Sequence, residues 1–243
     1  MINKIKQAFN RAANTYNDAC EMQHFAAMKL LQQIDAHIQH ETIMDLGCGT
    51  GLITQHFLRR THYQHCLSVD IADSALQIAK NSLTKENVHF MAIDFDQLNL
   101  PQSFSLIFSN MALHWSCDFA TLLAKLHGML QAEGLLAFTV PLQGTLIELQ
   151  DGHKKEYYEF TDIIDLLNNH FSIQYAHQYG YTTLFTTHLA ALHSLKNTGV
   201  THYKKACHKK GLTGKNQIQS LFKSMQSPIT LTYEIGVFIA RKS

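Results

Sequence analysis

The stretch MDLGCGTGL, residues 44–52, is the most unusual in the sequence. An apolar run ends at Asp45 and Leu46, and glycines follow at alternate positions, Gly47, Gly49 and Gly51. Glycine allows a sharp turn and a close approach to a ligand, and the N-terminus of a following helix offers free N–H groups. The pattern therefore predicts a buried strand, a ligand-binding turn and a helix that continues to about residue 60.

Outward from this turn, short apolar runs alternate with amphipathic stretches. The expected strands of this part are residues 42–46, 65–70, 88–94, 105–111 and 134–140. Helices are expected after the turn, from a cap at Asp73 or Ser74, and over residues 118–130. After Pro141 the regular alternation of strands and helices ends, and two more strands are expected at 171–179 and 229–242. This order predicts an α/β fold whose parallel sheet is covered by helices on both faces.

The whole chain, residues 1–243, is expected to form one domain. Residues 3–40 contain no Gly or Pro and carry apolar side chains at helical spacing, so residues 1–40 are expected to form a helical N-terminal lid. Residues 41–141 carry the strand–helix alternation and are the expected cofactor-binding core. Residues 142–170 and 187–223 are expected to be helical cap segments on the substrate side.

Composition narrows the class of protein. A hydrophobic content of 46% in 243 residues suits one globular unit, and a net charge of +1 does not indicate a nucleic-acid partner. No apolar run approaches the roughly 18 residues that span a bilayer, and no signal peptide is apparent. Five cysteines without a C-x-x-C pair favour a reduced, cytoplasmic protein. The cluster His62, His65 and Cys66 lacks a second ligand pair, so no metal is expected.

The residues around the turn favour one class of cofactor. A dinucleotide fingerprint reads G-x-G-x-x-G, but here Leu52 stands where the third glycine would be, which disfavours a dehydrogenase. Asp45 would repel a pyrophosphate but suits a ligand with an ammonium group. S-adenosylmethionine carries both an ammonium group and a cationic sulfonium, so it is the expected cofactor, with S-adenosylhomocysteine as its product.

Two more acids follow at the carboxyl ends of strands, where open α/β sheets bind ligands. Asp70 ends the second strand and is expected to accept the ribose hydroxyls of the cofactor. Asp94 ends the third strand and is expected to accept from the adenine amino group, with Phe95 stacking nearby. Asp94 taken alone could equally be a helix cap or a solvated loop residue.

The pattern D-L-G-C-G-T-G, an acid at the second strand and D-F at the third resemble the class I S-adenosylmethionine-dependent methyltransferases. This resemblance implies a Rossmann-like, seven-stranded, mostly parallel sheet with its last strand antiparallel. It implies these cofactor-binding residues: Tyr16, Asp45, Gly47, Cys48, Gly49, Gly51, Asp70, Ile71, Asp94, Phe95, Asn110 and Met111.

Flanking segments resemble a narrower family, the malonyl-acyl carrier protein O-methyltransferases of biotin synthesis. The resemblance runs from about residue 5 to 241 and rests on the order and spacing of short pieces. These are FNRAANTY (9–16), SNMALHWSCD (109–118), QGTLIEL (143–149), HSLKNTGVTHY (193–203), GLTG (211–214) and LTYEIGVFIAR (231–241). It implies methylation of the free carboxylate of a malonyl thioester, carried on acyl carrier protein or coenzyme A.

Such a carboxylate is already ionised at pH 7, so no general base and no metal is needed. Alignment of one oxygen with the methyl group and exclusion of water must then supply the rate. Tyr16, His114 and Trp115 are the expected positioning residues, although each could instead serve packing. Gln23 and His24 could also face the site.

The chain departs from the family where an arginine is expected to bind the malonyl carboxylate. The corresponding stretch, DGHKKEYYEFTD, has no arginine, and Lys154, Lys155, Tyr157 or Tyr158 could substitute. A basic region suits docking of an acidic carrier protein. Its expected docking residues are Lys196, Lys204, Lys205, Lys209 and Lys210, although a solvated basic loop would look the same.

Two other classes of enzyme and one non-enzyme remain as alternatives. A carboxyl methyltransferase of the trans-aconitate type and a quinone C-methyltransferase share the cofactor motifs, but the pattern from residue 193 to 241 disfavours both. A non-catalytic cofactor-binding or assembly protein is disfavoured by the intact turn and acids. The protein is expected to be a cytoplasmic monomer without a nucleic-acid or membrane partner.

Overall fold

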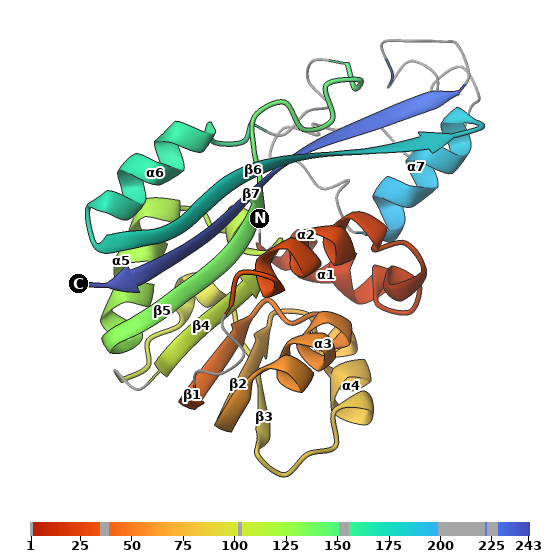
Figure 1. Ribbon diagram of the computed structural model, residues 1–243. Coiled ribbons are helices and arrows are strands. Elements are labelled where there is room, and N and C mark those ends of the chain that lie inside the picture. Colours follow the sequence, from red (N-terminus) through yellow and green to blue (C-terminus); the bar gives the residue numbers. More distant parts are fainter. Residues whose placement is uncertain (1, 35–38, 102–103, 151–155, 199–221, 223–227) are drawn as a thin grey trace.

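A single sheet of seven strands forms the centre of the protein (Figure 1). The computed structural model describes residues 2–34, 39–101, 104–150, 156–198, 222 and 228–243. The strands lie in the order β3-β2-β1-β4-β5-β7-β6. Their bounds are β1 Gln39–Leu46, β2 His62–Asp70, β3 Val88–Ala92, β4 Phe104–Asn110, β5 Leu130–Pro141, β6 Phe171–Phe185 and β7 Ile229–Lys242.

Strands β1 to β5 pair in parallel, while β7 runs antiparallel to both of its neighbours, β5 and β6. The predicted mostly parallel sheet with an antiparallel last strand is therefore confirmed. β6 is longer than the sequence indicated and pairs with β7 from Phe171 to Phe185. Because β5 pairs only with residues 235–241 of β7, β6 and β7 continue beyond it as a two-stranded ribbon (Figure 1).

Helices cover both faces of the sheet. Their bounds are α1 Ile2–Ala12, α2 Glu21–Leu31, α3 Leu52–Arg60, α4 Asp73–Ser82, α5 Phe119–Met129, α6 Phe160–Asn168 and α7 His188–Asn197. One core cluster joins Ile43 of β1 to side chains of α2, α3 and α7, and a second joins Met44 to those of α5 and α6. Successive residues of β1 thus face opposite cores, as expected of a strand buried on both sides.

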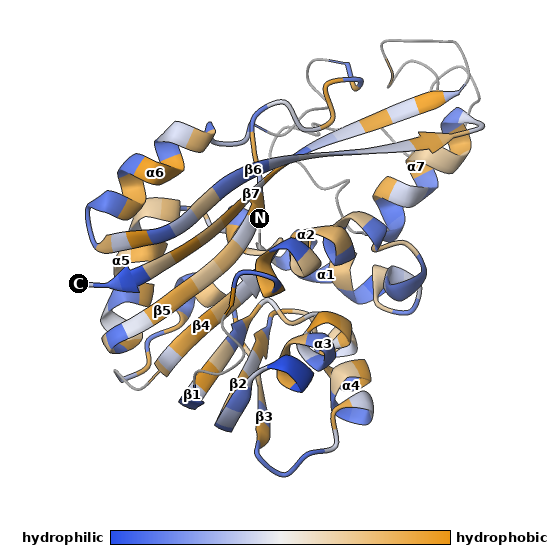
Figure 2. Ribbon diagram, viewed as in Figure 1, coloured by the Kyte–Doolittle hydropathy of each residue, from blue (hydrophilic) through white to orange (hydrophobic). Residues whose placement is uncertain are grey.

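The hydropathy of β7 follows this arrangement (Figure 2). The half that pairs with β5 is buried along both faces, whereas the half that starts at Ile229 alternates between buried and partly exposed residues. Alternation is typical of a ribbon with only one well-covered face. Within the part of the chain that the structure describes, no helix is long and apolar enough to cross a membrane.

The stretch of residues 3–40 that was expected to be helical contains two α-helices with a break between them, and its last two residues already belong to β1. α1 ends at Ala12, a short 3-10 turn covers Tyr16–Asp18, α2 ends at Leu31, and β1 begins at Gln39. The break falls in the stretch ANTYND, where Asn, Thr and Asp side chains compete for backbone hydrogen bonds. The hydroxyl of Thr15 indeed donates to the carbonyl oxygen of Ala12 over 3.2 Å.

The two expected helical cap segments contain one short helix each among the described residues, α6 and α7. Residues 142–150 instead follow β7 closely. The amide of Leu146 donates to the carbonyl of Thr232 over 2.6 Å, and the hydroxyl of Thr145 to that of Glu234 over 3.0 Å. Residues 199–221 lie outside the described residues.

Candidate functional site

A cavity lies at the carboxyl ends of β1, β2 and β4, below α1. Residues from five separate stretches of sequence line it. They are Ile5, Phe9, Ala13, Tyr16, Gly47, Gly49, Thr50, Asp70, Ile71, Ala75, Asp94, Phe95, Asn110, Met111, Ala112 and Trp115. Most of the residues expected to bind the cofactor are therefore brought together.

The glycine turn forms the floor of this cavity. Gly47 and Cys48 donate their amides to the carbonyl of Val69, and both Gly47 and Gly49 have a positive φ, +83° and +55°. A Cβ atom on Gly47 would lie 2.2 Å from that of Ala112, so the turn packs tightly against the loop after β4. A Cβ atom on Gly49 would meet nothing within 4 Å, which leaves room for a ligand above the turn.

Asp70, at the end of β2, faces the cavity beside the turn. One carboxylate oxygen accepts from the amide of Gly49 and the other from the amide of Ala72, both over 2.8 Å. Burial raises the pKa of this carboxyl, and the backbone hydrogen bonds oppose that rise. Each carboxylate oxygen has two lone pairs, so Asp70 retains capacity to accept from a ligand.

The third predicted acid has a local role as well. β3 ends at Ala92, and Asp94 is the N-cap of a 3-10 turn at Phe95–Gln97, where its carboxylate accepts from the amide of Asp96 over 3.0 Å. Asp94 and Phe95 both line the cavity. The Asp94 carboxylate can therefore cap the 3-10 turn and still contact a ligand.

Asn110, at the end of β4, holds the wall opposite Asp70 in place. Its amide donates to the carbonyl of Gln23 on α2 over 3.0 Å and accepts from the hydroxyl of Thr139 on β5 over 2.8 Å. The next residue, Met111, has a φ of +53°, and its amide donates to both the hydroxyl and the carbonyl of Thr139. These bonds stabilise a left-handed conformation that is rare for a side chain of this size.

The N-terminal segment closes the cavity from the other side. Ile5, Phe9 and Ala13 line it at a spacing of four residues, which is one face of a helix. Phe9 contacts Trp115 edge to face, with ring centroids 5.4 Å apart. The residues expected from the sequence did not include these three, although their helical spacing was a signal for a buried face.

Several expected site residues lie just outside the cavity lining. Asp45 is 2% exposed and accepts from the hydroxyl of Thr54 on α3 over 2.5 Å, behind the turn. Cys48 and Gly51 belong to the same turn, and His24 faces His56 of α3, with ring centroids 5.2 Å apart. Gln23 is buried, and its side-chain oxygen has no hydrogen-bond partner among the described residues.

The expected substrate side is built by two segments that meet. His114 contacts the ring of Trp115 at 5.1 Å and that of Tyr157 at 5.9 Å between centroids. Tyr158 packs on Phe119 and is 44% exposed. Lys196 lies on α7, whereas Lys154, Lys155, Lys204, Lys205, Lys209 and Lys210 lie outside the described residues. Among the residues that the structure describes, no cluster of three or more potential metal ligands is found.

Replacement of Asp45 by Asn is expected to stabilise the fold in a pH-dependent way. Burial raises the pKa of this carboxyl to about 7, against about 4 in the unfolded chain. The protonated form contributes its full stability below pH 4, and this contribution is lost as the pH rises through about 7. The gain in unfolding free energy from Asp45→Asn should therefore be about 1–3 kcal/mol larger at pH 8 than at pH 5.

Urea unfolding at the two pH values measures this difference, with Asp165→Asn, an exposed carboxyl on α6, as the control. A gain that is equal at pH 5 and pH 8 would show that Asp45 is ionised at both.

Comparison with known proteins shows to which family the chain belongs. The model of the methyltransferase domain family matches residues 44–138, which contain the turn and all three acids. A malonyl-[acyl-carrier protein] O-methyltransferase 2 of Coxiella burnetii is 33% identical over 98% of this chain and 96% of that protein. The chain belongs to the malonyl-[acyl-carrier protein] O-methyltransferase family. Another member, from Yersinia pestis, is 28% identical over 89% of this chain and 82% of its own length.

Solved structures agree on the fold of this O-methyltransferase family member. The YcgJ protein of Bacillus subtilis has a TM-score of 0.65 at 16% identity and covers 90% of this chain, with 98% of its own length matched. The N-methyltransferase NodS of Bradyrhizobium japonicum, solved with S-adenosyl-L-homocysteine, has a TM-score of 0.64 at 13% identity and covers 98% of both chains. The chain is thus an enzyme with a class I methyltransferase fold.

Proposed function

We propose that this enzyme transfers the methyl group of S-adenosylmethionine to the free carboxylate of a malonyl thioester, malonyl-acyl carrier protein, and so supplies a methyl ester for biotin synthesis. The observation that carries the proposal is the match to the Coxiella burnetii relative along nearly the whole of both chains. The cavity supports it, because the turn, Asp70 and Asp94 meet in one place.

The lining of the cavity suits the expected cofactor. Asp70 would accept the ribose hydroxyls, Asp94 would accept from the adenine amino group, and Phe95 would contact the adenine ring. The space above Gly49 would admit the ligand against the backbone, and Tyr16 would lie over its methionine end. Asp45, Cys48, Gly51, Ile71, Asn110 and Met111 would complete the cofactor-binding set, with Asp45 acting from behind the turn.

S-adenosylmethionine supplies an electrophilic methyl group on a cationic sulfonium. The residues of this chain have to align one carboxylate oxygen with it and keep water away. Alignment of this kind can contribute about 7–11 kcal/mol to the barrier reduction. The aromatic wall of Phe9 and Trp115 fits the exclusion of water, and no proton needs to move.

We propose His114 as the residue that positions the substrate carboxylate. None of the cavity-lining residues is a cation, and two are acids, so a carboxylate needs a compensating group at the edge. His114 stands there between Trp115 and Tyr157. Tyr157, Tyr158 and the lysines at 154 and 155 come from the stretch where relatives of this family are expected to carry an arginine.

Replacement of His114 by Ala is expected to raise the KM for the malonyl thioester about tenfold, with the affinity for S-adenosylhomocysteine changed less than twofold. Loss of one hydrogen bond to a charged group corresponds to about 1.5–3 kcal/mol, of which solvent at the cavity edge recovers a part. Steady-state kinetics and calorimetry measure the two quantities. His89→Ala, on the exposed surface of β3, is the control, and equal effects in both variants would remove His114 from the site.

A competition assay separates the proposed acceptor from its rivals. Malonyl-carrier protein, succinyl-carrier protein and trans-aconitate are offered together with labelled S-adenosylmethionine. Label on the malonyl thioester supports the proposal, and label on trans-aconitate would favour a small-acid methyltransferase.

Docking of the carrier protein is proposed at the basic region of Lys196, Lys204, Lys205, Lys209 and Lys210. An acidic recognition helix would be attracted to it, mainly through the rate of association. Five cysteines without a C-x-x-C pair favour a reducing compartment, so we also propose a cytoplasmic enzyme, and a monomer.

A further inference from the structure

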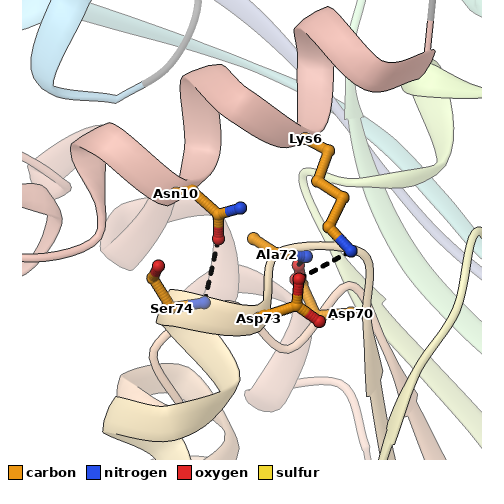
Figure 3. A network of polar contacts seen from close by, with 6 residues as sticks. All are labelled: Lys6, Asn10, Asp70, Ala72, Asp73 and Ser74. Carbon is orange, nitrogen blue, oxygen red and sulfur yellow. Dashed lines mark hydrogen bonds and ion pairs between the residues drawn. The ribbon is translucent and has the colours of Figure 1, made fainter.

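The N-terminus of α4 takes its cap from another helix. Its N-cap residue is Ala72, so the predicted capping by Asp73 or Ser74 is wrong. The first amides of a helix have no partner within the helix and need an acceptor. The side chain of Asn10 on α1 accepts from the amide of Ser74 over 2.9 Å, as Figure 3 shows. α1 thus supplies the acceptor that α4 lacks.

A second contact lies one helical turn along α1. The ammonium of Lys6 is 2.6 Å from a carboxylate oxygen of Asp73, in the first turn of α4 (Figure 3). The two side chains are 36% and 60% exposed, so the ion pair is modest and sensitive to salt. Lys6 and Asn10 are four residues apart and so share a face of α1.

The neighbouring face of α1 carries Ile5 and Phe9, which line the cavity. The loop between β2 and α4, against which α1 packs, begins at Asp70. The carboxylate of Asp70 also faces the cavity and accepts from the amide of Ala72. One helix therefore closes the cavity with one face and is fastened to the cavity's rim with the neighbouring face. The fastening residues Lys6, Asn10, Asp73 and Ser74 do not line the cavity.

We propose that Lys6 and Asn10 form a latch on α4 that sets how fast the cofactor enters and its product leaves. The inference rests on the proposed cofactor function. A ligand between the glycine turn and α1 leaves only when α1 moves away, and that movement breaks both latch contacts. Because none of the four latch residues lines the cavity, their contacts do not depend on the ligand, and the latch stabilises the closed state whether or not the cavity is filled.

This arrangement has a kinetic signature. Weakening the latch speeds opening in both states, so uptake and release accelerate together and the equilibrium affinity changes little. A residue that touches the ligand behaves differently, because its loss raises the dissociation constant. Lys6 and Asn10 act through α1, so they are positioning residues and not catalytic ones.

The test measures release of labelled S-adenosylhomocysteine from the intact protein after a chase with unlabelled ligand. Lys6→Met is expected to speed release about two- to fivefold and Asn10→Ala about fivefold. The double variant should be roughly tenfold faster or more if the two contacts act independently. The dissociation constant from calorimetry should stay within about twofold of the wild-type value.

Matched variants isolate the latch. Lys4→Met and Asn14→Ala remove the same groups from exposed positions of the same segment and should release like the wild type. Lys6→Arg retains the ion pair and should also do so. Trp115, the one tryptophan, contacts Phe9 and gives a fluorescence signal for the movement of α1 and for correct folding.

Salt adds a second readout. Release from the wild type should accelerate as ionic strength rises, and release from Lys6→Met should not. Wild-type release rates in Lys6→Met and Asn10→Ala would overturn the latch while leaving the cofactor function intact, and so would a raised dissociation constant without faster uptake. A wild-type protein that binds no S-adenosylhomocysteine would overturn both.

Discussion

Replacement of Gly49 by Leu is expected to leave the fold intact and to weaken S-adenosylmethionine binding by at least about 100-fold, or about 2.7 kcal/mol. A Cβ atom at this position meets no protein atom within 4 Å, so the new side chain enters the space above the turn. The backbone has a φ of +55°, and a left-handed leucine costs about 1–2 kcal/mol of stability, which a folded domain can absorb.

The matched control is Gly128→Leu. Gly128 lies in α5, away from the cavity, and a Cβ atom there also meets nothing within 4 Å. This variant should bind like the wild type and be slightly more stable, because leucine favours a helix over glycine. Calorimetric titration measures binding and thermal unfolding measures stability. Wild-type affinity in a folded Gly49→Leu protein would place the cofactor elsewhere.

Replacement of Asp70 by Ala is expected to lower the affinity for the cofactor by about 100-fold or more. Two hydroxyl donors of a ribose lose a charged acceptor, and each such bond contributes about 1.5–3 kcal/mol. The amides of Gly49 and Ala72 lose their acceptor too, so the turn and the start of α4 become less ordered.

Asp70→Asn separates the two causes, because it keeps an acceptor but removes the charge. It should fall between the wild type and Asp70→Ala in affinity for S-adenosylhomocysteine. Glu86→Gln, an exposed acid ahead of β3, controls for the change in net charge. An affinity of Asp70→Ala within about threefold of the wild type would show that the carboxylate only braces the turn.

The core of the fold follows from periodicity, because each buried strand of the first half is a short apolar run that ends at a turn. The N-terminal helices were harder to predict. Apolar residues keep a helical spacing through ANTYND, so periodicity does not show where the first helix ends. The structure shows it through the hydrogen bond that the Thr15 hydroxyl donates to the carbonyl of Ala12. The length of β6 depends on its partner β7, and alternation alone did not reveal residues 180–185 as strand.

The cofactor side of the candidate site is predictable because its residues stand at strand ends. Gly49, Asp70 and Asn110 meet since parallel strands place their carboxyl ends together. A lid from residues 1–40 was expected, but the residues of α1 that line the cavity were not named, because Ile5 and Phe9 are ordinary apolar residues whose pattern does not show which surface they cover. The cap that Asn10 provides to α4 joins residues 64 apart, and no local pattern predicts it.

The expected substrate side of the site depends most on contacts between residues that are far apart in the sequence. His114, in the turn after β4, contacts Tyr157, which lies between Pro141 and α6, and no local pattern predicts this contact. The sequence named the acceptor and gave His114 as one positioning candidate, and the structure adds the contact of His114 with Tyr157.

The identity of the methylated product tests the proposed methyl transfer to the malonyl carboxylate directly. The purified protein is incubated with labelled S-adenosylmethionine and malonyl-acyl carrier protein, and the thioester is analysed by mass spectrometry before and after mild alkali. We expect a methyl ester on the free carboxylate of the malonyl group, which alkali removes as labelled methanol. Label found on carbon or nitrogen, or an unmodified malonyl thioester beside a protein that binds the cofactor, would contradict the proposed methyl transfer.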